Sequence, residues 1–435
     1  FCLIATGVQG SGKSHTVGVT LENCILPFPY GDPHIVNLNT PMAALLFHYD
    51  QSENNFCEAT GMAGWTKKLK EVFNVSSGIS VGTEESLTES FAMEAPEEFS
   101  EVPLPDLRRA VSVFNENPLS SKIVVLVSPT NYTLRKTFYA SESYEVLPLL
   151  FRWNDLDAVQ LKKLMRINES DNQLYVGVML GLLRQYQRVG ALPEFNTFMK
   201  EITEQKDFSP GQIAPLNQRL MLLRQFISES TENKILQGQQ KNLKDLVASG
   251  KLVVADMTDP MLSPAEANGI FQVLLEQFRK IPRSDCKCGK VVVCDEAHKY
   301  FDGKLKGGDG LSGAIVDTVR LMRHEGIRVI VSTQSPLTMP QELLELSTVA
   351  VCHQFHSMEW YKYLANKLPL PPDGFKTVQK LQPGQALVYA ARSDFDHKNN
   401  IHGDDESEDD REGNEPFLVQ VRPRLTEDRG ASKQD

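Results

Sequence analysis

The sequence predicts a doubly wound α/β fold, in which helices cover both faces of a mainly parallel β-sheet. Three observations support this prediction. Short apolar runs rich in β-branched residues recur along the 435 residues. They are continuous rather than alternating, as expected of strands that are buried on both faces of a parallel sheet. Helical patterns lie between several of them, and this alternation is typical of the α/β class.

The expected strands are spread over the whole chain. In order, they are residues 1–6, 34–38, 122–128, 251–257, 290–295, 327–333, 349–353, 386–390 and 417–421. Residues 15–21 are compatible with a helix that follows the first strand directly. Residues 266–280 and 311–324 carry apolar side chains at the three- and four-residue spacing of an amphipathic helix.

Two stretches interrupt the alternation of strands and helices. Residues 76–105 are rich in Ser, Gly, Glu and Pro, which predicts a mobile acidic insertion. Residues 147–248 are helical in pattern, which predicts an α-helical subdomain inserted into the α/β core. The two parts of the core are then residues 1–146 and 249–435, and the second part contains an acidic loop at 404–412.

Composition limits the class of protein. The hydrophobic content of 41% and charged content of 23% are typical of a soluble globular protein, and the apolar runs are too short to span a membrane. Several of the seven cysteines lie in strand-like runs, which favours reduced thiols and an intracellular location, in the cytoplasm or nucleus. The first residue, Phe1, already belongs to an expected strand, so we expect the natural N-terminus to lie further upstream.

The net charge of −11 argues against a broad nucleic-acid-binding surface. This net charge is compatible with a local basic channel, because the acidic residues are concentrated at 84–101 and 404–410. Charge runs of this kind are usually solvated loops.

The segment Gly7–Ser14 (GVQGSGKS) fits the phosphate-binding P-loop pattern, with an apolar strand before it and a helix after it. Its glycines let backbone N–H groups converge on the β-phosphate at a helix N-terminus. Lys13 would reach the β- and γ-phosphates, and the Ser14 hydroxyl would hold Mg²⁺. The sequence therefore predicts an ATP site. Its expected contact residues are Gly7, Gln9, Gly10, Ser11, Gly12, Lys13, Ser14 and His15.

A second apolar run ends in two acids, Asp295 and Glu296. A carboxylate at a strand tip can hold Mg²⁺, and a second one beside it can orient and polarise the attacking water. We assign Asp295 to the metal and Glu296 to the water. The alternative is a strand end capped by two solvated acids, which the P-loop in the same chain disfavours.

The next strand ends at Gln334, whose amide is placed to touch the γ-phosphate or the attacking water if this strand lies between the two already described. Upstream of it, Arg320, Arg323 and His324 end a helix. Basic residues are favourable at a helix C-terminus, so these residues alone permit a capping role. They equally permit an arginine finger that acts on the nucleotide of a neighbouring subunit.

Residues 295–298 also spell Asp-Glu-Ala-His, the tetrad of a helicase class. Such helicases need a second α/β domain with further arginine motifs, and the residues after 333 show no such pattern. This assignment is disfavoured, and we expect His298 to be incidental.

In this order, the motifs resemble the HerA/FtsK superfamily of hexameric ATPases, and HerA-like proteins in particular. The resemblance rests on the segments 7–14, 293–298 (VCDEAH), 323–336 (RHEGIRVIVSTQSP), 381–388 (LQPGQALV) and 417–424. It implies a RecA-like fold with an additional strand and a catalytic glutamate. It also implies a homo-hexamer that translocates or remodels double-stranded DNA, often beside a nuclease or another effector.

The resemblance also bears on single residues. It places the arginine finger at Arg323, where the family's usual Gly-Arg-Lys reads Met-Arg-His. Lys299, Lys304 and Lys306 become candidate DNA contacts in a pore, because six copies would ring it with positive charge. An ordinary flexible glycine loop is the other interpretation of these lysines. The N-terminal β-barrel of HerA proteins is not in this sequence, and the segments 76–105 and 404–412 are additions to the family pattern.

The function expected from the sequence is Mg²⁺-dependent ATP hydrolysis at subunit interfaces of a ring that moves double-stranded DNA. One alternative is a nucleotide-dependent ring scaffold that activates a partner effector without translocation. A helicase of the Asp-Glu-Ala-His class is a second, disfavoured alternative.

Overall fold

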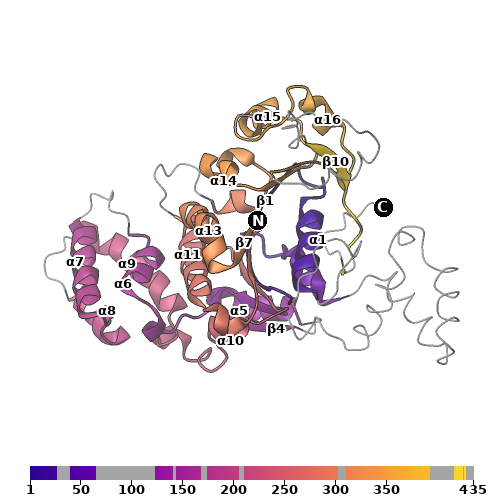
Figure 1. Cartoon of the computed structure of the whole chain (residues 1–435). Helices are drawn as coiled ribbons and strands as arrows, with labels where there is room; N and C mark the ends of the chain where they lie inside the picture. The colour runs from indigo at the N-terminus through magenta and orange to yellow at the C-terminus, as the bar shows by residue number, and fades with distance from the viewer. Residues whose placement is uncertain are drawn as a thin grey trace, which may run out of the picture.

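The computed structural model describes residues 1–26, 40–64, 123–140, 144–167, 174–204, 210–301, 310–391, 416–424 and 426–427. Within them, ten strands form one sheet in the order β10-β9-β8-β1-β7-β6-β2-β5-β3-β4 (Figure 1). All neighbouring pairs from β8 to β4 are parallel, and β9 is antiparallel to both of its neighbours. The strands are β1 (Cys2–Thr6), β2 (Ala43–Asp50), β3 (Ile123–Val127), β4 (Glu145–Pro148), β5 (Leu252–Thr258), β6 (Lys290–Cys294), β7 (Ile327–Thr333), β8 (Val349–Cys352), β9 (Gln385–Ala390) and β10 (Phe417–Gln420).

Helices connect most of these strands, as the sequence predicted. The α-helices are α1 (Lys13–Ile25), α5 (Tyr132–Phe138), α6 (Ala158–Leu164), α7 (Leu174–Val189), α8 (Phe195–Thr203), α9 (Pro210–Phe226), α10 (Leu243–Leu246), α11 (Pro264–Lys280), α12 (Arg283–Cys286), α13 (Leu311–Glu325), α14 (Gln341–Glu345), α15 (Met358–Ala365) and α16 (Gly374–Lys380). Short 3₁₀ helices are η1 (Glu58–Ala63), η4 (Pro129–Asn131), η5 (Trp153–Asp155), η6 (Thr231–Asn233), η7 (Ala297–Lys299) and η8 (Pro336–Thr338).

The sheet is covered on both faces, which confirms the predicted fold class. Alternate residues of a strand point to opposite faces, so Ile4 of β1 belongs to one apolar core cluster and Leu3 to the other. Helices α11 and α13 pack into the first cluster and α1 into the second, and they lie on opposite sides of the sheet in Figure 1. This is a doubly wound, mainly parallel sheet.

Two strands were missed by the sequence prediction. β2 (Ala43–Asp50) begins with Ala-Ala-Leu-Leu, residues with high helix propensity, and only its burial between β5 and β6 makes it a strand. β4 (Glu145–Pro148) is a four-residue edge strand that ends in proline, which is tolerated only at an edge. The strand expected at 34–38 and the insertion expected at 76–105 lie outside the described residues.

All the described elements between β4 and β5, from η5 to α10, are helices. These helices extend to one side of the sheet (Figure 1). Trp153 packs there against Phe195 and Phe198, with ring centroids 5.1 and 4.9 Å away. The cluster is continuous with the core on the α11 face. The domain boundaries at 147 and 248 stay a prediction. None of the described helices has the length and apolar character needed to cross a membrane.

Candidate nucleotide-binding site

The loop between β1 and α1 has the glycine-dependent backbone turns that the motif predicted. Gly10 and Gly12 have φ angles of 77° and 106°, in the left-handed region that favours glycine. The Val8 amide donates to the Gln354 carbonyl at 2.9 Å, and the Ser11 hydroxyl donates to the Val8 carbonyl at 2.7 Å. These bonds fix the loop ahead of α1, whose first N–H groups form a ready anion site.

Lys13, the first residue of α1, is 4% exposed, and its ammonium donates to the Val8 carbonyl at 3.0 Å. Burial lowers the pKa of Lys13, and the carboxylates of Glu296 and Asp295 oppose this effect. A phosphate oxygen is a stronger acceptor for an ammonium than a neutral carbonyl. A nucleotide phosphate would therefore readily replace the Val8 carbonyl as the acceptor of the Lys13 hydrogen bond.

Gly7 shows why this loop cannot carry larger residues. A Cβ at this position would lie 2.5 Å from the Ser11 hydroxyl oxygen and 2.7 Å from His353 Cβ. We expect Gly7→Ala to destabilise the protein by about 1–3 kcal/mol and to weaken ATP binding, because the loop must shift. Denaturant unfolding and equilibrium ATP binding measure the two effects. In the control, Gly177→Ala, the new methyl meets open space on α7, and unchanged ATP affinity is expected there. Equal ATP affinity in Gly7→Ala would contradict this account of the loop.

His353, which follows β8, is a residue that the sequence reasoning missed. Its Nε2 lies 2.8 Å from the Thr16 hydroxyl of α1, and its Nδ1 lies 3.0 Å from the Gln385 carbonyl. Burial lowers the pKa of His353 to about 4, so the ring is neutral near pH 7. It therefore links α1 to the strands beyond β1 through neutral hydrogen bonds.

Asp295 and Glu296 follow β6, and β7 lies between β6 and the P-loop strand β1. This is the strand order that the sequence reasoning required for Gln334. Gln334 Nε2 donates to Glu296 Oε2 at 2.7 Å. The three side chains therefore meet the P-loop at the carboxyl edge of the sheet, as parallel strands dictate.

Glu296 combines backbone strain with burial. Its φ and ψ of 49° and 42° are left-handed, which is uncommon for a residue other than glycine and is frequent at functional sites. Burial raises the pKa of Glu296, the charge of Asp295 raises it further, and Lys13 partly opposes both. A carboxylate with a raised pKa is a better proton acceptor than an exposed one.

His298 lies in the short helix η7, and its ring contacts two residues of the site, which the sequence did not predict. Its Nε2 lies 3.5 Å from Glu296 Oε2, and its Nδ1 accepts from the backbone N–H of Gln334 at 3.4 Å. Burial lowers the pKa of His298 to about 4, so the ring is neutral. A neutral ring that accepts at Nδ1 carries its proton on Nε2, the ring nitrogen that lies nearer to Glu296.

Asp295 is 5% exposed, and its Oδ1 accepts from the Glu296 amide at 3.1 Å. Its Oδ2 faces His48 Nδ1 at 3.8 Å. His48 lies on β2, the missed strand, and is paired in register with Asp256 of β5. Burial lowers the pKa of His48, but Asp295 and Asp256 raise it more, so the net direction is upward. The only sequence signal was a His-Tyr-Asp end to an apolar run.

Asp256 is fully buried and belongs to a separate ion pair. It accepts from the Arg135 guanidinium at 2.6 Å, from the Tyr139 hydroxyl at 2.7 Å and from the Thr258 hydroxyl at 2.6 Å. Arg135 also donates to the carbonyls of the loop after β2, at residues 53 and 55. The Asp256 carboxylate is thus fully hydrogen-bonded. Through Arg135 it also helps to hold the loop after β2 in place.

The donor atoms near the P-loop fit Mg²⁺. The half-buried Ser14 hydroxyl and the Asp295 carboxylate are hard oxygen donors on the loops that meet at this edge, and Mg²⁺ prefers such ligands. Bound there with a nucleotide, Mg²⁺ would neutralise phosphate charge.

Arg323 lies far from its own P-loop. α13 ends at Glu325 and β7 begins at Ile327, so Arg323 belongs to the edge where the strands begin, opposite the carboxyl edge. It is exposed, and within the described residues it has no ion-pair partner. Arg320, one turn earlier, pairs instead with Asp317 and Glu342.

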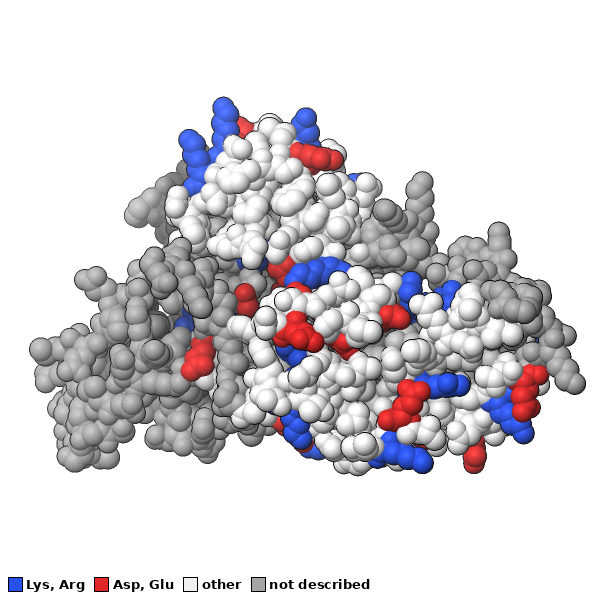
Figure 2. Space-filling view, turned by 180° about the vertical axis from the view of Figure 1, so that it is seen from behind, with Lys and Arg blue, Asp and Glu red and all other residues white. Residues whose placement is uncertain are grey.

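The candidate DNA contacts are only partly described. Lys299 forms an ion pair with Asp50 at the end of β2, with 2.6 Å between nitrogen and oxygen. Burial tends to raise the pKa of Asp50, but hydrogen bonds from Lys299, the Ser52 amide and the Asn55 side chain lower it to about 2. Lys304 and Lys306 lie outside the described residues, as does the acidic loop 404–412. On the face shown in Figure 2, basic and acidic side chains are interspersed rather than gathered into one basic surface.

Residues 416–424 and 426–427, near the C-terminus, contact α1. Glu22 of α1 is fully buried, and it accepts from Arg422 Nη1 at 2.8 Å and from the Thr426 hydroxyl at 2.6 Å. His15 Nε2 lies 2.8 Å from the Arg422 carbonyl. His15, expected from the motif to contact nucleotide, therefore contacts this segment, which the motif did not predict.

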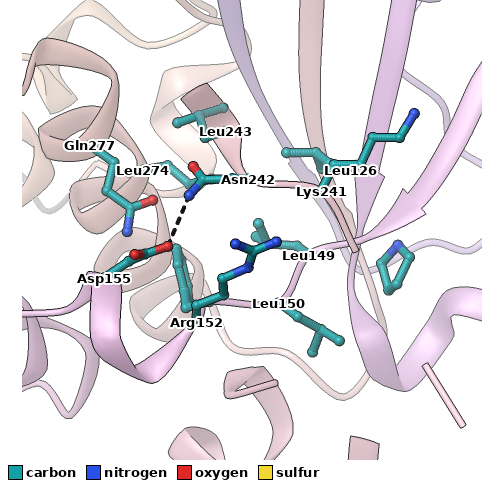
Figure 3. Close-up of a pocket in the computed structure, with 12 residues that line it drawn as sticks. Leu126, Leu149, Leu150, Arg152, Asp155, Lys241, Asn242, Leu243, Leu274 and Gln277 are labelled. Carbon is teal, nitrogen blue, oxygen red and sulfur yellow. Dashed lines mark hydrogen bonds between the residues drawn. The ribbon is translucent and has the colours of Figure 1, made fainter. Parts of the chain in front are cut away.

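A pocket between the ends of β3 and β4 and the helix α11 is separate from this site (Figure 3). Leu126, Leu149 and Leu274 line it, and Asn242 donates to Asp155 across it at 2.9 Å. β3 is separated from β6 by β5 and β2, so this pocket takes no part in the P-loop site.

No protein-family model matches the chain, and no curated protein matches it in sequence. Several solved structures are similar in fold. The genome packaging NTPase from Sulfolobus turreted icosahedral virus 2, in complex with AMPPCP, is 18% identical with a TM-score of 0.28, over 35% of this chain and 67% of that chain. VirB4 of Thermoanaerobacter pseudethanolicus is 12% identical with a TM-score of 0.40, over 68% and 84%. The bacterial conjugative coupling protein TrwBdeltaN70 is 12% identical with a TM-score of 0.38, over 98% and 86%. These scores are too low to support a functional inference, which must come from the residues of this chain.

Proposed function

We propose that the chain hydrolyses ATP with Mg²⁺ at the P-loop site. The observation that carries this proposal is the hydrogen bond between Gln334 and Glu296 at the same sheet edge as Lys13, with β7 between β1 and β6. A phosphate-binding loop, a buried carboxylate with a raised pKa and a polar amide that contacts it are the groups that phosphoanhydride hydrolysis requires.

Each residue has a distinct proposed role. Lys13 and the backbone amides of the loop bind the phosphates, and Ser14 with Asp295 holds Mg²⁺. Glu296 orients the attacking water and accepts its proton. Gln334 holds Glu296 and senses the γ-phosphate. His298 helps to position both residues, because its Nε2 faces the Glu296 carboxylate and its Nδ1 accepts from the Gln334 backbone N–H.

We further propose a homo-hexameric ring of the HerA type that translocates or remodels double-stranded DNA. The position of Arg323 supports a ring, because an exposed arginine at the opposite edge of the sheet can meet a P-loop only on a neighbouring subunit. The proposal for DNA rests on the motif order described under Sequence analysis. A nuclease or another effector would be the partner of such a ring.

Two measurements test these proposals. Mass in solution, with and without ATP, reports whether a ring forms. The rate of ATP hydrolysis, with and without double-stranded DNA, separates a motor from a ring scaffold. A ring whose hydrolysis is indifferent to DNA would favour the scaffold that acts on a partner effector. A monomer that hydrolyses ATP would contradict the shared site.

Gln334→Ala tests the proposed sensor. We expect slower hydrolysis with ADP affinity nearly unchanged, because ADP lacks the phosphate that the amide senses. Single-turnover hydrolysis and ADP titration measure the two effects. Gln341→Ala, on the short helix α14, is the control, and it should change neither. A large loss of ADP affinity in Gln334→Ala would show that the residue is structural.

A further inference from the structure

A second cluster of metal-ligating side chains shares Asp295 with the P-loop site, and its other two members take no part in the proposed hydrolysis. It consists of His48 on β2, Cys57 in the loop before η1 and Asp295 after β6. One potential ligand atom from each lies within 4.8 Å of the other two, and all three residues are buried. Among the described residues, no other group of three His, Cys, Asp or Glu side chains comes together in this way.

His48 is the observation that points to a ligand. The residue is 3% exposed, and neither of its ring nitrogens has a hydrogen-bond partner. An imidazole that is buried without partners is costly, since polar groups removed from water normally find one. The gap of 3.8 Å between Nδ1 and Asp295 Oδ2 is too long for a hydrogen bond. It is a gap that a metal ion can span, because zinc binds nitrogen and oxygen ligands at about 2.0–2.2 Å each.

The surrounding residues hold two of these ligands in place. The Cys57 carbonyl accepts from the Thr60 amide at 3.0 Å and from its hydroxyl at 2.7 Å, which fixes the backbone that carries the thiol. Asp295 Oδ1 is held by the Glu296 amide, which leaves Oδ2 directed at His48. Asp256, the next carboxylate, is already occupied by Arg135 and Tyr139 and is therefore not a ligand.

We propose that His48, Cys57 and Asp295 bind one divalent cation of the zinc class per chain. A set of one imidazole, one thiolate and one carboxylate suits Zn²⁺ or Co²⁺ and is unsuited to Mg²⁺, which takes oxygen ligands. Binding converts the Cys57 thiol to a thiolate and releases its proton to solvent. Three protein ligands leave one coordination position for water, as in zinc sites that exchange a ligand.

This binding does not require nucleotide, so it can be tested independently of the proposed hydrolysis. Its consequence for hydrolysis rests on the proposed function, since Asp295 is shared by the two sites. A zinc-class ion that holds Asp295 would withdraw that carboxylate from the nucleotide site, and loading of the cluster would then oppose turnover.

The test is titration of the full chain with Co²⁺ alone, in the absence of nucleotide. We expect one Co²⁺ per chain, with the near-ultraviolet charge-transfer band of a cobalt–thiolate bond and the visible bands of a tetrahedral ion, all of them lost when Zn²⁺ is added. In Cys57→Ser the charge-transfer band should vanish, and in His48→Gln the affinity should fall at least about tenfold. Thermal unfolding of each variant shows whether it folds. If Cys57→Ser does not fold, Cys57→Ala takes its place in the titration.

Cys286→Ser is the matched control. Cys286 and Cys288 lie close together, with Cys286 Sγ 3.5 Å from the Cys288 carbonyl, so they offer an alternative place for a cobalt–thiolate bond. The spectrum should be unchanged in this variant. A parent chain without the charge-transfer band would overturn the proposal. So would a band that persists in Cys57→Ser and is lost in Cys286→Ser.

Discussion

Glu296→Gln should bind ATP with nearly the parent affinity and hydrolyse it about 100- to 10,000-fold more slowly. The carboxamide keeps the shape of the side chain and can still accept the hydrogen bond that Gln334 donates. It cannot accept a proton from the attacking water, so the loss falls on kcat rather than on binding. Single-turnover hydrolysis and equilibrium ATP binding separate these two quantities. Glu359→Gln, an exposed change on α15, is the control.

The pH profile provides an independent check on the same residue. Burial raises the pKa of Glu296 above its ordinary value of 4.5, and Asp295 raises it further. A general base must be ionised, so activity should fall as pH drops through this raised pKa. The acid limb of kcat should therefore lie at a higher pH than an exposed glutamate would give. Normal turnover in Glu296→Gln would remove the residue from the catalytic machinery altogether.

Arg323→Ala should bind ATP normally and hydrolyse it roughly a thousandfold or more slowly, as expected when an arginine finger is removed. The finger acts on a neighbouring subunit, because Arg323 and its own Lys13 lie at opposite edges of the sheet. Lys13→Ala should lose tight ATP binding but keep its finger. A mixture of the two inactive variants should therefore recover part of the activity, since some intact Arg323 meets an intact Lys13.

Arg320→Ala is the matched control for this experiment. Arg320 lies one turn before Arg323 on α13, and its guanidinium is already engaged by Asp317 and Glu342. Its removal should leave hydrolysis near the parent rate. If the mixture of Arg323→Ala and Lys13→Ala stays inactive although subunits exchange, the arginine only caps its helix and the shared site is refuted.

The parts of the site that the sequence predicted are those that depend on contiguous residues. The glycine pattern from Gly7 to Gly12 determines the loop backbone, and the two acids after an apolar run mark a strand end wherever that strand lies. Short-range rules of backbone conformation suffice for these two features. The position of Gln334 also required β7 to lie between β1 and β6, and the sheet has this strand order. The role of Gln334 stays a prediction.

The parts that escaped prediction depend on which strands become neighbours. His48 lies on a strand that begins with helix-forming residues, and its burial beside Asp295 follows only from the pairing of β2 with β6. His353 reaches Thr16 from a distant part of the chain, and Glu22 is matched by Arg422 across 400 residues. No local pattern encodes such contacts, because tertiary packing decides them.

The central position of β1 has a consequence for the nascent protein. β1 is translated before every other strand described here, yet its two sheet neighbours, β7 and β8, are translated near the other end of the chain. Cys2 of β1, for example, hydrogen-bonds to Thr348, 346 residues away. Pairings this distant form slowly, because a large loop must close before any contact rewards it. During translation, β1 therefore has neither of its sheet neighbours until residues 327–333 and 349–352 have been synthesised.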